Sequence, residues 1–189
     1  EQRELLPENV VGFMYGNGYG VMKNSDEAAR WYHRGAEKGD VNAQFNLGVI
    51  YENGEGVSQD SAEALRWFQL AAEKGEADAQ YHLGRLYDRG EGVPEDDNEA
   101  IRWFRLAADQ GQADAQNTLG VMFDTGEGVL EDDEEAVRWY RLAAEQGDAY
   151  AQYNLGFMYD DGEGVPEDDE EAVRWYRLAA EQGDIDAQL

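Results

Sequence analysis

The sequence predicts an all-α fold made of about five helix pairs, and three observations support this prediction. The chain repeats with a period of 36 residues, which is clearest in its five tryptophans, Trp31, Trp67, Trp103, Trp139 and Trp175. Five glycines keep the same period, at Gly12, Gly48, Gly84, Gly120 and Gly156. Within each repeat, apolar residues recur at helical spacing. A strict period of this size is typical of a repeat array, so we expect one continuous array over residues 1–189.

The second repeat shows the pattern of the first helix of each pair, which we call helix A. Asp40 is a candidate N-cap, because its carboxylate can accept from the free N–H groups of a helix start. Helix A is then predicted over residues 41–53, with Ala43, Leu47 and Tyr51 on one apolar face. Gly48 lies beside that face. Since glycine weakens a helix, we expect a close helix crossing there.

The second helix of the pair, helix B, is predicted to follow a tight turn. Two glycines, Gly54 and Gly56, end helix A and favour positive φ, and Val57 is expected to close the end of the pair. Asp60 and Glu63 then resemble a capping box at the start of helix B. Its buried face is predicted to contain Ala64, Trp67, Phe68, Ala71 and Ala72, and Gly75 is expected to end it.

The other face of helix B is predicted to be solvated, because it carries opposite charges at helical spacing. The expected pairs in the last two repeats are Glu134 with Arg138, Arg141 with Glu145, Glu170 with Arg174, and Arg177 with Glu181. The repeats are predicted at about 4–39, 40–75, 76–111, 112–147 and 148–183, and residues 184–189 begin a further helix. That last helix has no polar cap, so we expect either a longer array or contact with another molecule at this end.

Composition limits the classes of partner. The net charge is −27 and the pI is about 4.1, which disfavours nucleic acid and anionic lipid and favours basic partners or simple solubility. No apolar run approaches the roughly 20 residues that a bilayer requires. The chain has no cysteine, so disulfides and thiolate metal sites are excluded and the compartment stays open. Because it begins at Glu1, both a soluble cytoplasmic protein and an exported one with its leader removed fit.

The repeat resembles the Sel-one-like repeat, a relative of the tetratricopeptide repeat. The third repeat carries the matching residues Ala79, Gln80, Leu83, Gly84, Tyr87, Gly90, Gly92, Val93, Asp96, Glu99, Ala100, Arg102, Trp103, Ala107, Ala108 and Gly111. The resemblance implies antiparallel helix pairs stacked into a right-handed α-solenoid with a concave inner face. It also implies a non-enzymatic adaptor, often bacterial. The cysteine pairs of one bacterial branch are missing here.

Signals for catalysis, metals or cofactors are weak. The glycine pairs lack the third glycine and the preceding strand of a dinucleotide-binding loop. The acidic loops do not fit a calcium-binding loop, because Tyr159 or Phe157 would occupy the first ligand position. The two histidines, His33 and His82, have no second ligand at metal spacing. We therefore predict no catalytic residue, no metal and no cofactor.

The side chains that vary on helix A, opposite its apolar face, are the candidate binding residues. At 100° per residue they are expected to line the concave groove. They combine aromatic rings, amides, a hydroxyl and a cation: Phe45, Asn46, Tyr81, His82, Arg85, Thr118, Tyr153, Asn154 and Phe157. The residues that could bond the main chain of an extended peptide are Asn46, His82, Thr118 and Asn154. Those that could form side-chain pockets are Phe45, Tyr81, Tyr153 and Phe157. In the alternative interpretation, the aromatics pack against the neighbouring repeat.

The sequence thus predicts a protein–protein interaction scaffold that binds a protein or peptide in its concave groove. One alternative is a structural protein that self-associates end to end. A second is a hydrolase acting on cell-wall or β-lactam-like material, for which no single pair of carboxylates stands out. The identity of the partner is not encoded in any motif that we recognise.

Overall fold

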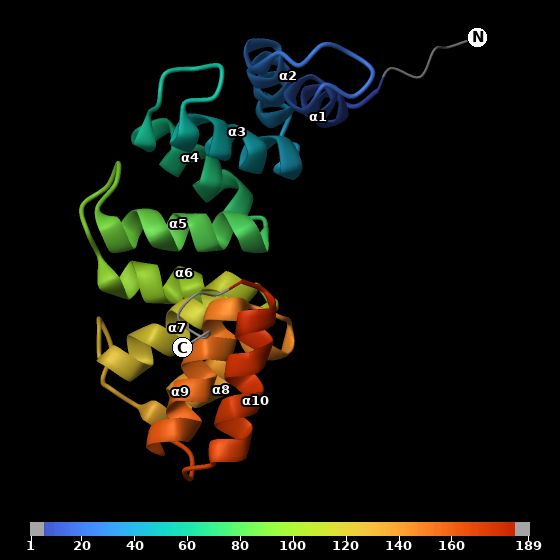
Figure 1. The fold of residues 1–189 in the computed structure, drawn as a ribbon. Coiled ribbons are helices and arrows are strands. Elements are labelled where there is room, and N and C mark those ends of the chain that lie inside the picture. The colour runs from blue at the N-terminus through green and yellow to red at the C-terminus, as the bar shows by residue number, and fades with distance from the viewer. Residues whose placement is uncertain (1–5, 184–189) are drawn as a thin grey trace. The chain divides into compact units, whose positions relative to one another are not determined.

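The computed structural model describes residues 6–183, and this part of the chain contains ten α-helices and no strand (Figure 1). The helices are α1 (Glu8–Asn17), α2 (Ser25–Glu37), α3 (Val41–Asn53), α4 (Ser61–Ala72), α5 (Ala77–Arg89), α6 (Asp97–Asp109), α7 (Ala113–Thr125), α8 (Asp133–Glu145), α9 (Ala149–Asp161) and α10 (Asp169–Glu181). Odd-numbered helices correspond to helix A and even-numbered ones to helix B. The predicted fold class, an all-α solenoid of five helix pairs, is confirmed.

Two compact bodies make up the chain, and each is described by itself. The N-terminal body extends to Asp96 and contains α1 to α5, whereas the C-terminal body begins at Asp97 and contains α6 to α10. The helix predicted to begin at residues 184–189 lies outside the described residues. No helix among residues 6–183 is long and apolar enough to cross a bilayer.

Side-chain caps begin most of the helices. Asp40 accepts from the N–H of Ala43 at 2.8 Å, and Asp148 accepts in the same way from Ala151 at 2.7 Å. At the start of α5 the equivalent residue is Glu76, whose side chain makes no cap hydrogen bond. Gln112, the equivalent residue at the start of α7, has a side chain of the same length and does accept from the N–H of Ala115, so side-chain length alone does not explain the missing bond.

The capping box predicted for helix B is half correct. Asp60 accepts from the N–H groups of Ala62 and Glu63 at 3.0 and 3.1 Å. The return bond is wrong, because the N–H of Asp60 donates to the carbonyl of Tyr51 at 3.0 Å instead. The carboxylate of Glu63 pairs with Arg66 at 3.2 Å. The residue that begins helix B is thus bound to the end of helix A.

A glycine lets the two helices of a pair approach closely. A Cβ built on Gly48 would lie 2.6 Å from the ring of Phe68, closer than carbon atoms can pack. In the turn after α3, Gly54 and Gly56 have φ of 73° and 75°, and a Cβ on Gly56 would meet the backbone of Ser25. These contacts confirm the predicted close crossing and the predicted tight turn.

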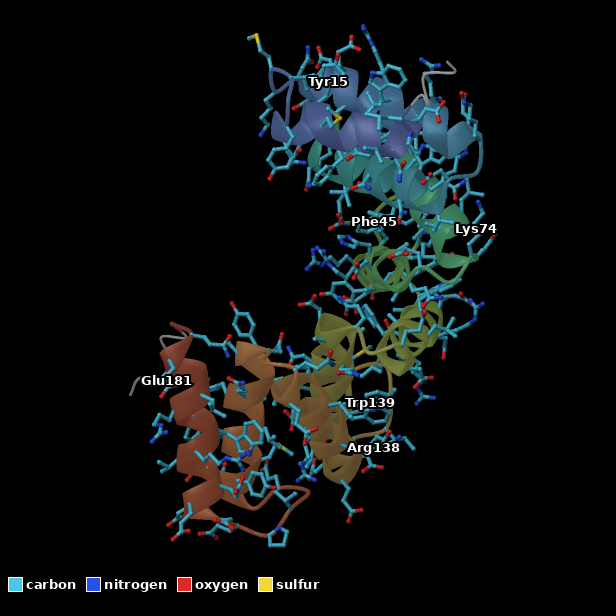
Figure 2. The ribbon with its side chains drawn as sticks, turned by 90° about the vertical axis from the view of Figure 1, so that its right-hand side faces the viewer. Tyr15, Phe45, Lys74, Arg138, Trp139 and Glu181 are labelled. Carbon is cyan, nitrogen blue, oxygen red and sulfur yellow. The ribbon has the colours of Figure 1, made fainter. Side chains whose placement is uncertain are left out.

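Buried glutamines join successive pairs, a role that the sequence did not reveal. The side-chain amides of Gln44, Gln80, Gln116 and Gln152 donate to the carbonyls of Ala36, Ala72, Ala108 and Ala144, at the end of the preceding helix B. The side-chain oxygen of Gln44 also accepts from Lys74, which is labelled in Figure 2, at 3.0 Å. Each of these helix-end carbonyls also accepts from the N–H of the glycine three residues later, so the glutamine supplies a second donor and links the next helix A to that end.

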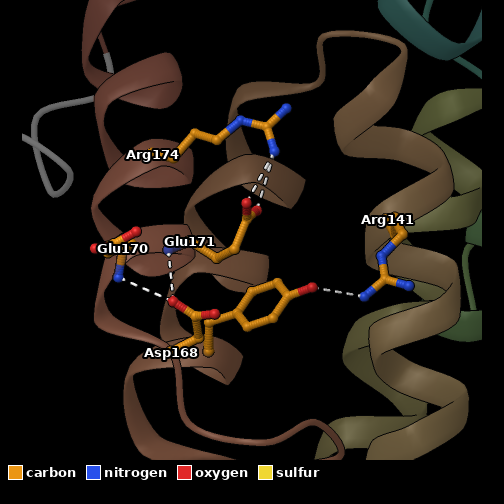
Figure 3. A network of polar contacts seen from close by, with 6 residues as sticks. Arg141, Asp168, Glu170, Glu171 and Arg174 are labelled. Carbon is orange, nitrogen blue, oxygen red and sulfur yellow. Dashed lines mark hydrogen bonds and ion pairs between the residues drawn. The ribbon is translucent and has the colours of Figure 1, made fainter.

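The predicted charge pairs on helix B need correction. Arg138 and Arg174 lie three residues after their partners, 3.1 Å from Glu135 and 3.0 Å from Glu171, and do not pair four residues back. Arg141 donates to the hydroxyl of Tyr159 on the next pair at 2.8 Å, and not to Glu145 (Figure 3). Only the predicted pair of Arg177 with Glu181 is present, at 3.4 Å. The guanidinium of Arg138 also covers the ring of Trp139, 5.4 Å from its centroid, which favours the three-residue partner.

Candidate functional site

The nine candidate binding residues all lie on odd-numbered helices, in two separate sets. Phe45, Asn46, Tyr81, His82 and Arg85 lie on α3 and α5 of the N-terminal body. Thr118, Tyr153, Asn154 and Phe157 lie on α7 and α9 of the C-terminal body. We call the surface that contains each set the helix-A face of that body.

Aromatic packing dominates the helix-A face of the N-terminal body. The ring of His82 stacks on the ring of Phe68, with centroids 4.8 Å apart and an interplanar angle of 21°. The ring centroid of Phe45 on α3, a residue labelled in Figure 2, lies 5.7 Å from that of His82 and 6.0 Å from that of Phe68. Phe45 therefore packs between successive helices, as the packing interpretation of the aromatics predicts, and His82 packs there as well. Their contact with a partner stays a prediction.

Glu52 on α3 joins two of the candidate residues into an ionic cluster. His82 Nδ1 lies 2.9 Å from the Glu52 carboxylate, and the Arg85 guanidinium lies 3.9 Å from it. Only 16% of the Glu52 side chain is exposed. Burial alone would raise the pKa of Glu52, but the contact with His82 and the charges of His82, Arg85 and Arg89 outweigh it, and the pKa is lowered. The sequence missed Glu52, because its partners come from the next repeat.

The candidate amides already have partners inside the protein. Asn46 donates to the carbonyl of Asn42 on its own helix at 2.7 Å. Asn154 on α9 donates to the side-chain oxygen of Asn117 on α7 at 3.3 Å, a long bond. Both side chains are half-buried, as is Thr118. These amides remain within reach of a peptide, but a partner must compete with the internal bonds.

Exposed aromatic rings mark the helix-A face of the C-terminal body. Phe157 is 40% exposed and its neighbour Tyr150 is 71% exposed, although both belong to a well-packed helix. Tyr153 lies against Tyr176 of α10, with centroids 5.5 Å apart. Burial, followed by the nearby charges of Asp160 and Asp161, raises the pKa of Tyr176 to about 12. This hydroxyl therefore stays protonated at neutral pH.

A related tyrosine–carboxylate contact occurs one pair earlier. The buried Tyr140 of α8 donates to Asp124 of α7 at 3.1 Å. Burial raises the pKa of Asp124, and the nearby Asp133 adds to this, although the bond from Tyr140 opposes it. Burial likewise raises the pKa of Tyr140 above its usual range. In the N-terminal body the ring at this place is Phe68, which has no hydroxyl, and His82 instead contacts the carboxylate of Glu52.

Clefts also occur, and the sequence did not predict them. One of about 550 Å³ lies between α2 and α3 and is lined by Arg30, His33, Arg34, Tyr51 and Val57, among others. On the helix-A face, a cleft of about 150 Å³ is lined in part by Asn46 and Val49. Within residues 6–183, no group of three or more metal-binding side chains is close enough to hold an ion. The arrangement can bind a partner through apolar, polar and charged contacts.

Comparisons with known proteins point to one repeat family. A family profile described as Sel1 repeat matches residues 9–40, 41–76, 77–112, 113–148 and 149–184. A solved Sel1 repeat protein from Oxalobacter formigenes is 40% identical, with a TM-score of 0.89 over 95% of this chain and 72% of that one. No curated protein matches the chain.

Two further structures extend this comparison. A protective antigen of uropathogenic Escherichia coli strains, described as having an SLR fold, is 41% identical with a TM-score of 0.92. The match covers 96% of this chain and 39% of the antigen, so the chain spans well under half of that protein. An immunity protein from Pseudomonas aeruginosa shares 24% identity over 97% of this chain and 68% of its own, with a TM-score of 0.62, which shows the fold alone.

Proposed function

This chain belongs to the Sel1 repeat family, and from that premise we propose that it is a non-enzymatic scaffold that binds another protein or a peptide through its helix-A faces. Proteins of this family generally mediate protein–protein interaction, and the fold is typically not that of an enzyme. The finer proposal concerns the surface. The partner contacts the helix-A face of one or both bodies.

The exposure of Phe157 carries the proposal. A large apolar ring that is 40% exposed on a rigid helix gains free energy when a partner covers it. Tyr150, one turn of helix away from Tyr153 and Asn154, extends the same surface. Because the start of α9 is fixed by the cap of Asp148 and by the buried Gln152, its side chains are positioned before binding, and little ordering free energy is lost.

Site-specific photocrosslinking tests this surface directly. A benzophenone amino acid would replace Phe157 or Tyr81 on the helix-A faces, and Leu142 on α8 as a control of similar exposure to Phe157. In cells that produce the chain, we expect covalent adducts with another protein from the first two positions and not from the third.

Two results would contradict the proposal. Adducts from position 142 alone would place binding on the exposed surface of the even-numbered helices, which we call the helix-B face. Adducts only with a second copy of the chain would favour the self-assembling alternative, which light scattering over a range of concentrations would then verify.

A further inference from the structure

We propose that the helix-A face of the C-terminal body, formed by α7, α9 and the loops that follow them, binds a positively charged segment of a partner protein, rich in arginine or lysine. This inference rests on the proposed function and names the chemistry of the partner at one of the two faces. It follows from where the charges of this body lie, from its exposed aromatic rings and from the lack of cations beside its carboxylates.

Positive and negative charges are segregated in this body. Residues 97–183 contain 22 Asp and Glu, six Arg and no Lys or His. All six arginines lie on α6, α8 and α10: Arg102, Arg105, Arg138, Arg141, Arg174 and Arg177. Helices α7 and α9 and the loops after them contain acidic residues and no basic one. The carboxylates of the helix-A face therefore have no basic residue on α7, on α9 or in the loops after them that could neutralise their charge.

The two faces of this body differ in how their carboxylates are neutralised. On the helix-B face, Glu135, Glu171 and Glu181 each pair with an arginine. On the helix-A side, Glu163 in the loop after α9 has a raised pKa, first from desolvation and then from the charges of Asp133, Asp161, Asp124 and Glu131. These groups repel one another, and a bound cation would relieve that repulsion.

Aromatic rings beside the carboxylates suit a guanidinium or ammonium group. Phe157 lies one helical turn before Asp161, and Tyr153 contacts Tyr176, whose hydroxyl is near enough to Asp160 and Asp161 to feel their charges. A cation over an aromatic face is attracted by the electron-rich face of the ring, in addition to its attraction to the carboxylates. Neighbouring aromatic rings and carboxylates thus offer arginine or lysine both a cation–aromatic contact and an ionic contact.

The N-terminal body provides an internal contrast. Its helix-A face carries Arg85 and the exposed Arg89 on α5, together with His82, and their carboxylate partner Glu52 is largely buried. Because these cations repel a cationic segment, we expect it to bind this face more weakly than that of the C-terminal body. The inference therefore applies to the C-terminal body and not to every acidic surface of the protein.

Peptide binding to the whole chain tests the inference. The probe is a fluorescent peptide of about 12 residues in which arginine alternates with leucine and serine, so that it presents cations along an extended segment. Matched peptides carry glutamine or glutamate in place of each arginine. We expect the arginine peptide to bind at low salt at least about tenfold more tightly than the glutamine peptide, and its affinity to fall as salt is raised.

Two charge-neutralised variants locate the site. The first is Asp160→Asn with Asp161→Asn and Glu163→Gln on the helix-A side. The second, with the same change in net charge, is Glu134→Gln with Glu145→Gln and Glu170→Gln on α8 and α10. We expect the first to weaken binding of the arginine peptide about tenfold and the second about twofold at most, because only the first removes direct contacts. Since the first variant removes repulsion, its melting temperature should not fall, and a loss of binding would not reflect unfolding.

The aromatic contribution is tested by Phe157→Ala, which should weaken binding several-fold, with Phe157→Trp restoring it. Equal losses in the two charge variants would overturn the inference, since net charge alone would then explain binding. Equal binding of the arginine and glutamine peptides, or no binding of either, would also overturn it. Those results would leave the scaffold function standing if position 157 still crosslinks to a protein.

Discussion

At the scale of single residues, the glycine of helix A has a measurable function. Gly48→Ala places a methyl group 2.6 Å from the ring of Phe68, whereas Gly16→Ala places one 3.8 Å from Ala28, an ordinary contact. Alanine gains up to about 1 kcal/mol over glycine inside a helix, but overpacking costs about 1–3 kcal/mol. In urea unfolding we expect Gly48→Ala to be destabilised, and Gly16→Ala to be unchanged or slightly stabilised. Equal stability of the two variants would contradict the close crossing.

Glu52 is predicted to stabilise the fold in its ionised form. Its pKa in the folded protein is lowered, so its contribution is fully present above the ordinary value of 4.5 and is lost as the pH falls through the folded pKa. Glu52→Gln should therefore reduce stability by about 1 kcal/mol at pH 7, a figure reduced for partial solvation. The gap from the unmodified protein should narrow when unfolding is repeated below pH 4.5. A gap that is constant with pH would rule out the ionic contribution.

Asp124 should show the opposite sign. Its pKa is raised above the ordinary value of 3.8, so the ionised form costs stability at neutral pH, and this cost disappears as the pH falls below that value. Asp124→Asn keeps an oxygen that can accept from Tyr140. We therefore expect a higher melting temperature than that of the unmodified protein at pH 7 and convergence of the two near pH 3.8. A lower melting temperature at pH 7 would show that the carboxylate is needed for the bond.

At this scale the sequence predicted the role of a residue correctly where its contacts lie within its own helix pair. Ala43, Leu47 and the tryptophans were predicted from their spacing, and Gly48 from its disagreement with helix propensity. The contacts of Glu52 and Asn154 could not be predicted in this way. Each partner lies on the next or the preceding helix A, and a spacing rule within one helix says nothing about which side chains face each other across repeats.

At the scale of helices, the caps provide a reciprocal test. The side chain of Glu76 makes no cap hydrogen bond at the start of α5, whereas Asp40 caps α3. We expect Glu76→Asp to stabilise the protein by about 0.5–1 kcal/mol and Asp40→Glu to destabilise it by a similar amount. Thermal unfolding of both variants would decide this. Shifts in the same direction would mean that charge near the helix end, and not the cap bond, controls the result.

The bounds of the helices followed from local signals. Helix α3 occupies residues 41–53 as predicted, because an aspartate begins it and a glycine with φ of 73° follows its last residue. The sequence predictions were wrong where one polar group can choose between several hydrogen-bond or ion-pair partners. The return bond of the capping box fails because the N–H of Asp60 donates to the carbonyl of Tyr51 on helix A. The four-residue pair of Arg138 fails because Glu135, three residues back on the same helix, competes with Glu134 for its guanidinium.

At the scale of the whole molecule, each tryptophan should matter mainly to its own body. Trp67 and Trp139 are buried equivalents in the two bodies. Replacing either with alanine should cost about 3–5 kcal/mol in urea unfolding. Because repeat arrays gain stability from neighbouring contacts, we expect amide exchange to accelerate most in the body that contains the substitution. Uniform acceleration along the chain would instead indicate a single cooperative unit.

Function at this scale was predictable in class and not in detail. The 36-residue period and the composition were enough to predict a repeat scaffold. The side chains that vary on helix A were enough to propose a binding surface. The segregation of all six arginines of the C-terminal body onto α6, α8 and α10 is visible in the sequence only after the helices are assigned to faces. The chemistry of the proposed partner could therefore be inferred only once the structure was known.

The buried glutamines also bear on how such a gene can change length. Each of the four donates to an alanine carbonyl eight positions earlier, on the preceding helix B. Loss of residues 112–147 would bring Gln152 opposite Ala108, the place that Gln116 now holds. Unequal recombination by a multiple of 36 codons thus recreates a working junction at once, whereas any other step breaks it. Copy number can drift by whole repeats while the surface residues of each copy diverge toward new partners.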